Sequence, residues 1–251
     1  VALDLVHEFH EPERILPWMA SRGCPFACRF CAGQAFDSQQ RRMPVAQVLD
    51  QVEETATRFG AERIFFMDDC LNADPAWFGE LCRGLAKRKL AWEAPNGLRA
   101  RNLSAGQVAA MVRADVRKPS LSAESGSERV LEKLVGKKQQ PVHIRRATQL
   151  LSRRGIPPRV HFIIGFPGEE RSEMQQSLAF AAELAEEFGA EPRLQVATPV
   201  PGTPMHEEAQ RRGLLLAQAE NMDPLDLFAS AGMIRDAAFD PDSLARFRAA
   251  F

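Results

Sequence analysis

Three cysteines near the N-terminus are the strongest candidates for chemistry in this sequence. Cys24, Cys28 and Cys31 follow a C-x3-C-x2-C spacing. Soft thiolates suit iron–sulfur clusters or zinc, and a cubane cluster has four iron corners. Because three cysteines hold three of those corners, the spacing predicts an iron–sulfur centre with one iron open to another ligand.

A structural zinc ion is the alternative, and it normally requires four protein ligands in a closed tetrahedron. No histidine lies between His10 and His143, and no second close pair of cysteines follows. Of the other thiols, Cys70 follows a predicted strand and Cys82 lies in a predicted helix, facing the sheet. The sequence therefore favours the iron–sulfur centre over zinc.

The elements that must position these thiols are short apolar runs alternating with amphipathic segments, which is typical of βα units around a parallel sheet. Between the first two runs, apolar residues from Val45 to Phe59 recur at helical spacing, and Gly60 ends that helix. The expected strands are Ile15–Ala20, Arg63–Met67, Ala91–Leu98, Lys118–Glu124, Arg159–Gly165 and Arg193–Thr198.

Helix start and stop signals agree with this arrangement. Asp74 followed by Pro75 predicts an N-cap and a helix that runs to about Arg88. Further signals are capping boxes or terminal glycines, namely Ser104 with Gln107, Ser125 with Glu128, Gly155 and Gly189.

Six βα units are fewer than the eight of a closed barrel, so we expect an α/β fold, a partial (β/α)6 TIM-like barrel whose sheet is open at one edge. Turn signals at Asp223-Pro224 and Asp240-Pro241 predict a short helical appendage on the open side. The expected domains are a core barrel at residues 1–213 and a C-terminal helical extension at residues 214–251. The start at Val1 leads us to expect a further domain upstream.

The nearly balanced charge of the chain argues against partners that bind through a strong electrostatic field, such as nucleic acids or membrane surfaces. Lysine and arginine total 32 against 33 acidic residues, a formal net charge of -1, so there is no strong nucleic-acid or membrane signal. A small-molecule or localised substrate is expected. The charged residues among the first twenty do not fit the pattern of a signal peptide, and no long apolar run follows. Clustered reduced thiols are typical of the cell interior, so we expect a cytoplasmic localisation.

The cysteine loop, with Phe30 before its third cysteine, resembles the signature of the radical S-adenosylmethionine (radical SAM) superfamily. The resemblance extends from about Pro17 to Gly213 and includes motifs at predicted strand ends. These motifs are Phe66–Asp69, Pro95–Arg99, Ser122–Ser127, Phe162–Glu169 and Pro199–Pro204. The carboxyl ends of barrel strands are where α/β barrels assemble active sites.

The resemblance implies a [4Fe–4S] cluster on Cys24, Cys28 and Cys31, with S-adenosylmethionine (SAM) chelating the open iron through its amino and carboxylate groups. An electron from an external donor of the flavodoxin or ferredoxin type then cleaves the sulfur–C5′ bond and yields a 5′-deoxyadenosyl radical. The protein orients this cofactor and excludes water.

The same resemblance implies roles for individual residues, each with a plainer alternative. Asp68 and Asp69 would contact the methionyl amino group or only cap and solvate their loop. Glu124 and Ser125 would lie near the ribose, although Ser125 also suits a helix cap. Contacts to adenine or its surroundings are implied for Ile164, Gly165, Val196, Thr198 and Phe30, with Gly165 alternatively a strand-end turn.

Two further side chains have structural interpretations that we favour. His161 lies in an apolar strand and is expected to be a satisfied barrel histidine. Cys70, beside Asp69, is expected to be a small buried residue, with metal ligation or hydrogen donation to a substrate radical as the alternative.

The subgroup that this chain resembles is often preceded by a cobalamin-binding domain and includes methyltransferases and ring-forming enzymes. That likeness favours a methyltransferase and implies cobalamin as an additional cofactor, although no residue here indicates a cobalamin ligand. No auxiliary cluster is expected, because the tail after Gly213 contains no cysteine. The rival hypothesis is a non-catalytic iron–sulfur or zinc-binding module on a degenerate barrel.

Overall fold

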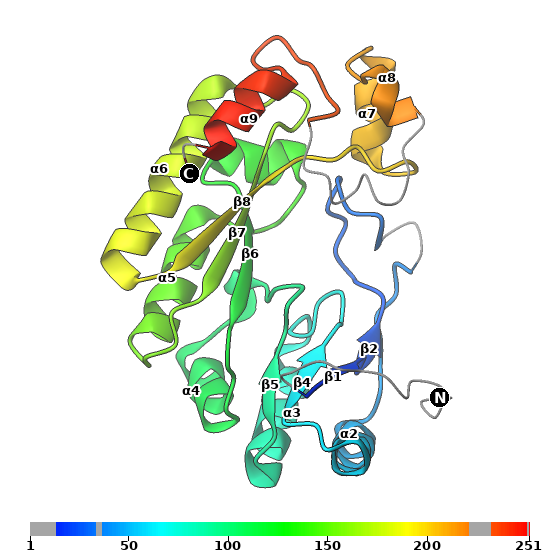
Figure 1. The fold of residues 1–251 in the computed structure, drawn as a ribbon, viewed down its shortest axis with the longest axis vertical. Helices are drawn as coiled ribbons and strands as arrows, with labels where there is room; N and C mark the ends of the chain where they lie inside the picture. The colour runs from blue at the N-terminus through cyan, green and yellow to red at the C-terminus, as the bar shows by residue number, and fades with distance from the viewer. Residues whose placement is uncertain (1–13, 34–36, 221–231, 250) are drawn as a thin grey trace.

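The computed structural model describes residues 14–33, 37–220, 232–249 and 251. Isolated parallel bridges, Trp92–Val116 and Leu98–Leu121, connect two three-stranded parallel sheets whose strand order follows the chain (Figure 1). One sheet contains β1 (Ile15–Trp18), β4 (Arg63–Phe66) and β5 (Ala91–Glu93), and the other contains β6 (Ser120–Glu124), β7 (Arg159–Ile164) and β8 (Glu191–Val196). This is the parallel α/β arrangement that successive βα units produce.

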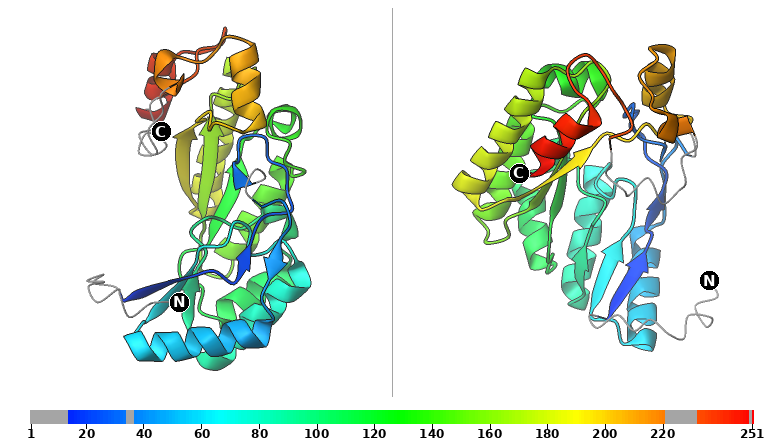
Figure 2. Two further views of the ribbon diagram at one scale, coloured as in Figure 1. Left: turned by 90° about the vertical axis from the view of Figure 1, so that its right-hand side faces the viewer. Right: turned by 45° about the horizontal axis from the view of Figure 1, so that its top comes forward.

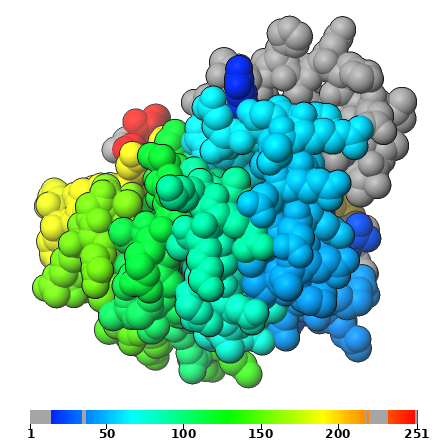
Figure 3. Space-filling view, turned by 90° about the horizontal axis from the view of Figure 1, so that it is seen from below, coloured from blue at the N-terminus to red at the C-terminus, as the bar shows by residue number. Residues whose placement is uncertain are grey.

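Helices cover one face of these strands and, seen from below, follow one another in chain order (Figure 3). They are α2 (Val45–Phe59), α3 (Pro75–Arg88), α4 (Ala105–Arg113), α5 (Pro141–Ser152) and α6 (Arg171–Phe188). Their apolar stripes pack on the strands around fully buried Trp92. The rings of Phe66 and Phe78 meet Trp92 edge-on, each at 6.0 Å between centroids. The contact of Phe78 with Trp92 fixes α3 against the sheet, and that of Phe66 links two neighbouring strands.

The opposite face of β6, β7 and β8 is largely polar. Side chains alternate along a strand, so the residues between the buried positions point away from the helices. On this face the register aligns Ser122 of β6 with His161 of β7 and Arg193 of β8, and pairs Ile163 with Gln195. Inward positions in closed barrels are mostly branched apolar residues, so this face is built to line a cavity rather than to form a core.

Several predicted strand bounds are wrong by a few residues. β5 ends at Glu93 rather than Leu98, since Pro95 has no amide donor and Gly97 turns the chain with φ of +90°. β8 begins at Glu191 and ends at Val196, two residues before the predicted Thr198. A short antiparallel pair, β2 (Ser21–Arg22) with β3 (Arg41–Arg42), is not predicted by the sequence pattern.

Most predicted helix ends are confirmed. Gly60 and Gly189 cap α2 and α6 in the left-handed region, the Asp74 side chain caps α3, and Ser104 forms a capping box with Gln107 on α4. Gly155, which also has a positive φ, lies in the turn after α5, three residues beyond the last helical residue, Ser152.

The capping box predicted for Ser125 and Glu128 is wrong. The cap lies two residues later, at Ser127, whose hydroxyl accepts from the Val130 amide at 3.3 Å ahead of a π-helical segment, Val130–Leu134. The Ser125 hydroxyl instead accepts a hydrogen bond from the Ser127 amide.

The C-terminal region contains α7 (Pro204–Arg211), α8 (Ala217–Glu220) and α9 (Pro241–Ala249). The predicted turn at Asp240-Pro241 starts α9, where Asp240 and Ser243 cap each other, whereas Asp223-Pro224 lies outside the described residues. Leu244 of α9 packs against β7 and β8, so the appendage lies beside the last strand (Figure 2). Among the described helices, none is long and apolar enough to cross a membrane.

Candidate functional site

The cysteine loop follows β2 and is held by backbone contacts from distant segments. The Arg29 amide donates to the Val135 carbonyl at 2.8 Å, and the Met205 amide donates to the Arg29 carbonyl at 3.0 Å. Gly23 enters the loop with φ of +79°, where a Cβ would lie 2.6 Å from the Gln39 carbonyl oxygen. The loop is therefore fixed at its start and its middle, and its start tolerates only glycine.

The three thiols line a cavity of about 350 Å³, which we call the cysteine cavity. All three cysteines are free thiols. Within the described part of the chain, no group of three or more His, Cys, Asp or Glu side chains could hold a single metal ion. Three thiols lining one cavity can supply three of the four iron ligands of a cubane cluster, whereas a structural zinc ion needs four protein ligands.

The cysteine thiols have different acidities. A hydrogen bond from the Cys70 thiol lowers the pKa of Cys24 to about 7. Burial raises the pKa of Cys28 to about 11 and also raises that of Cys31. Cys70 is buried at the wall of the cavity, and its hydrogen bond to Cys24, together with burial, raises its own pKa.

Arg99 contributes a buried positive charge to this cavity, with only 6% of the residue exposed. Its guanidinium lies over the ring of Phe26, 3.9 Å from the centroid, and donates to the Lys138 carbonyl at 3.2 Å. The side-chain amide of Asn72 accepts a hydrogen bond from the Arg99 backbone amide and donates one to the Arg99 carbonyl. Burial lowers the pKa of Arg99, while the thiols of Cys28, Cys70 and Cys24 act in the opposite direction.

A buried ion pair forms another wall. Glu124 has a φ of +67°, a left-handed conformation that is rare for a non-glycine residue, where the β6–β7 register shifts. Its carboxylate accepts from Lys137 Nζ at 2.7 Å, and the same ammonium donates to the Ser122 carbonyl at 2.6 Å. Strain of this kind, held by a satisfied charge pair, is a feature of functional sites.

The structure brings some of the predicted site residues to the cysteine cavity. Asp69, Glu124 and Phe30 line it, and the Phe30 ring lies 5.8 Å from that of Phe166. Asp68 does not line it, because its carboxylate accepts hydrogen bonds from the amides of Ala20 and Ser21 and from the Ser21 hydroxyl. Asp68 therefore braces the chain just ahead of the cysteine loop.

Three other predicted residues face away from the cavity. The Ser125 hydroxyl hydrogen-bonds Ser177 of α6 at 2.9 Å, and Ile164 packs in the apolar cluster that includes Leu244. Gly165 has a φ of +86°, and a Cβ there would lie 2.9 Å from Leu244. Its neighbour Ile163, which belongs to the same predicted motif but is assigned no cofactor contact, lines the cavity instead.

The carboxyl group of Glu169 holds the strand-end turn at Gly165 and Phe166. One of its carboxylate oxygens accepts from the amides of Gly165 and Phe166, at 2.6 and 3.0 Å. The other oxygen is buried and has no hydrogen-bond partner in the described part of the chain. Burial raises the pKa of Glu169 to about 8.

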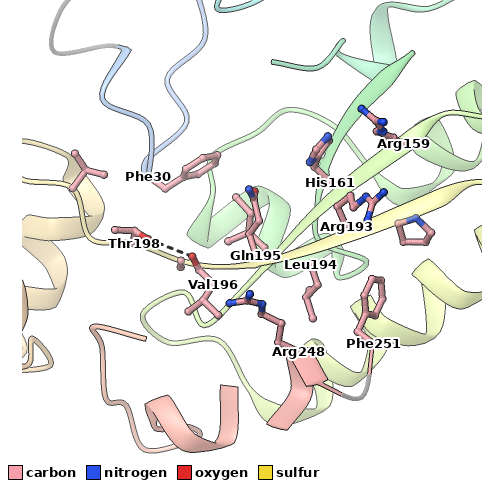
Figure 4. Close-up of a pocket in the computed structure, with 14 residues that line it drawn as sticks. Phe30, Arg159, His161, Arg193, Leu194, Gln195, Val196, Thr198, Arg248 and Phe251 are labelled. Carbon is pink, nitrogen blue, oxygen red and sulfur yellow. Dashed lines mark hydrogen bonds between the residues drawn. The ribbon is translucent and has the colours of Figure 1, made fainter. Parts of the chain in front are cut away.

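A second cavity, of about 870 Å³, follows β7 and β8, and we call it the β7–β8 cavity (Figure 4). Its lining includes the predicted residues Val196 and Thr198, and it shares a wall with the cysteine cavity. The shared residues are Phe30, His161, Ile163 and Gln195. Among the residues that the structure describes, His161 Nε2 is buried without a hydrogen-bond partner, so the expectation of a satisfied barrel histidine is wrong.

Comparison with known proteins gives consistent results. The family model of the radical SAM superfamily matches residues 18–181. An uncharacterized methyltransferase of Pyrococcus horikoshii is 29% identical over 79% of this chain and 42% of its own length. The cytidylyl-2-hydroxyethylphosphonate methyltransferase of Streptomyces wedmorensis is 30% identical over 78% of this chain and 37% of its own.

The fold is similar to that of TsrM, a radical SAM methyltransferase from Kitasatospora setae whose structure contains cobalamin and a [4Fe–4S] cluster. The TM-score is 0.70 at 18% identity, covering 79% of this chain and 39% of TsrM. The chain thus spans about two-fifths of the length of the proteins it matches.

Proposed function

This chain belongs to the radical SAM superfamily, and we propose that it binds a [4Fe–4S] cluster through Cys24, Cys28 and Cys31 and cleaves SAM reductively. The observation that carries the proposal is the convergence of three free thiols from one rigid loop on a cavity that also presents Arg99, Lys137 and Glu124. Three soft ligands match three irons of a cubane and leave the fourth for SAM. When bound and reduced, such a cluster supplies the electron that splits the sulfonium.

The residues of this chain would bind and orient SAM. We assign Asp69 to the methionyl amino group, because its carboxylate lines the cavity and suits an ammonium. Glu124 is assigned to the ribose hydroxyls, held in place by Lys137. In this assignment Asp68 positions the cysteine loop, and Ser125 secures the strand end to α6.

The adenine would lie toward the end of β8. Val196 and Thr198 line the β7–β8 cavity beside the shared wall of Phe30 and Ile163. Gly165 and Ile164 would contribute backbone atoms at the neighbouring strand end, in a turn that Glu169 holds by accepting the Gly165 amide. Apolar walls around the cofactor exclude water from the reacting bond.

For the fold, we propose a partial (β/α)6 barrel at residues 1–213 with a C-terminal extension at residues 214–251. This is supported by the strand order, which follows the chain across both sheets, and by α9, which packs beside β8. The polar concave face would then be the barrel interior.

For the reaction, we propose methyl transfer with cobalamin as an additional cofactor, bound by a part of the protein outside this chain. The methyltransferase relatives favour this reaction. Radical SAM enzymes take an external electron donor, and we propose a flavodoxin or ferredoxin. The cell interior is the proposed compartment, because the cysteines must stay reduced to hold a cluster.

Anaerobic reconstitution with iron and sulfide, followed by dithionite and SAM, tests this function. We expect 5′-deoxyadenosine from the wild type and none from Cys28→Ala. S-adenosylhomocysteine would appear in addition only when cobalamin and the rest of the protein are present. A wild type that carries the full cluster but forms no 5′-deoxyadenosine with dithionite contradicts the proposal.

A further inference from the structure

The β7–β8 cavity has a strong bias in charge. Arg159, Arg193 and Arg248 line it, and none of its described lining residues is acidic. The carboxylate of Glu191 pairs with two of these arginines, because its Oε2 lies 3.5 Å from Arg159 and 3.6 Å from Arg193. One carboxylate is therefore shared by two guanidinium groups, and the cavity keeps an excess of positive charge.

Two buried polar atoms of this cavity, Arg159 Nε and His161 Nε2, make no hydrogen bond among the described residues. Arg159 Nε still lies 3.5 Å from Glu191 Oε2 in an ion pair, so His161 Nε2 is the atom left without a described partner. An unsatisfied buried donor or acceptor costs about 1–3 kcal/mol, so such atoms point to a ligand that completes them. Burial lowers the pKa of His161, which keeps its ring neutral and able to donate or accept a hydrogen bond.

These groups lie on one face of the sheet and lead to the cysteine cavity. Arg159, His161 and Ile163 alternate along β7, and Arg193 and Gln195 lie beside His161 and Ile163 on β8. In Figure 4, Arg193, His161 and Gln195 lie on one side of β8, and Arg248 approaches from the other side. Since a strand rises about 3.3 Å per residue, Arg193 is roughly 7 Å from the shared wall at Gln195.

We propose that the β7–β8 cavity is the substrate site and that the substrate carries an oxyanion, a phosphate, phosphonate or carboxylate group, which Arg159 and Arg193 bind. Guanidinium groups recognise these planar or tetrahedral oxyanions through paired hydrogen bonds. The carbon that reacts would lie roughly 7 Å or more from the anionic group, at the wall formed by Phe30, Ile163 and Gln195. This inference rests on the proposed function, which places SAM in the adjoining cavity.

Binding of small oxyanions to the anaerobically reconstituted protein tests the inference without turnover. Methylphosphonate and acetate are the probes, and dimethyl methylphosphonate and acetamide are their neutral counterparts, each titrated by calorimetry at low salt. We expect saturable binding of one or both anions and none of the neutral compounds. The stronger of the two anions identifies the class of group.

The variants are Arg193→Gln, the double variant with Arg159→Gln, and Arg154→Gln as an exposed control in the turn after α5. We expect affinity to fall about threefold in the single variant and about tenfold in the double variant, which corresponds to the loss of charged hydrogen bonds partly screened by solvent. The Arg193 side chain is 58% exposed, so its replacement leaves the fold intact. Circular dichroism checks this directly.

Equal losses in Arg154→Gln, equal affinity for the neutral probes, or no saturable binding to the wild type would each overturn the inference. The proposed function fails separately. Wild-type protein that forms 5′-deoxyadenosine but binds no anion contradicts only the substrate class. Protein that binds anions in an arginine-dependent way but never cleaves SAM contradicts only the radical SAM activity.

Discussion

The charged groups of the cysteine cavity are paired within the protein, whereas those of the β7–β8 cavity are paired only in part. Lys137 is bonded to Glu124 and to the Ser122 carbonyl, and Arg99 donates to the Lys138 carbonyl. In the β7–β8 cavity, Arg159 and Arg193 share the single carboxylate of Glu191. His161 Nε2, in the wall between the two cavities, makes no hydrogen bond within the described part of the chain. The difference indicates one site organised in advance for a fixed cofactor and another that a ligand must complete.

The largest effect is expected from Cys28→Ala, which removes a proposed cluster ligand. The brown absorbance of the reconstituted protein should be lost while the helical circular dichroism stays largely intact, because Cys28 belongs to a surface loop and not to the core. Cys82→Ala is the matched control, since that thiol is buried in α3 away from both cavities. Unchanged iron content in Cys28→Ala would refute the ligand assignment.

Lys137→Met tests whether the buried ion pair between Lys137 and Glu124 stabilises the cysteine cavity. The Lys137 and Glu124 side chains are 5% and 7% exposed, so the substitution leaves a buried carboxylate without its partner. We expect the free energy of unfolding to fall by about 3–5 kcal/mol, and to recover in part when Glu124→Gln is added. Urea denaturation of the apoprotein measures both. A loss no larger than that of Arg193→Gln would remove the contrast between the cavities.

Arg99→Met should change the cluster rather than the fold. The reduced cluster carries one more negative charge than the oxidised cluster, and the nearby Arg99 guanidinium stabilises that charge. Removing the guanidinium should therefore lower the reduction potential of the cluster by roughly 30–60 mV, which is a three- to tenfold change in the equilibrium constant for one electron. Arg101→Met is the control, because Arg101 bonds the same Lys138 carbonyl from an exposed position. An anaerobic redox titration followed by electron paramagnetic resonance decides, and equal shifts in both variants would contradict the role of Arg99.

The last prediction is a pH dependence and concerns Glu169, the buried carboxyl group that accepts the Gly165 and Phe166 amides. Its pKa is raised from 4.5 to about 8, so between these values the folded protein binds more protons than the unfolded chain. Stability should therefore decline as pH rises from about 4.5 to 8 and level off above that. In Glu169→Gln this decline should be weaker. Parallel stability–pH profiles for the two proteins would show that Glu169 does not titrate in this range.

Much of this architecture is predictable from the sequence, because strand order, helix stripes and caps are local patterns. The caps at Asp74 and Gly60 are examples. The three thiols are equally accessible to sequence analysis, since their spacing alone limits the metal chemistry. Pro95 within an apolar run already indicates that the strand must end early.

What the sequence does not reveal is which neighbour of a pair faces the cavity. Asp68 and Asp69 are identical in type, yet the first binds Ser21 and the second faces the cavity. Ile163 and Ile164 likewise point to opposite faces of the sheet. A shift of one residue in the pairing register of the strand would exchange them. Lys137 carries no local signal, because it meets Glu124 only through a loop that follows the π-helical segment.

The central claim is that three cysteines leave one iron open to SAM. Electron paramagnetic resonance of the reconstituted, dithionite-reduced protein, recorded with and without SAM and combined with iron analysis, tests it most directly. The account predicts about four irons per chain and a signal whose g values change when SAM is added. Iron at this stoichiometry with a signal that SAM leaves unchanged would mean that no iron is open, and would contradict the account.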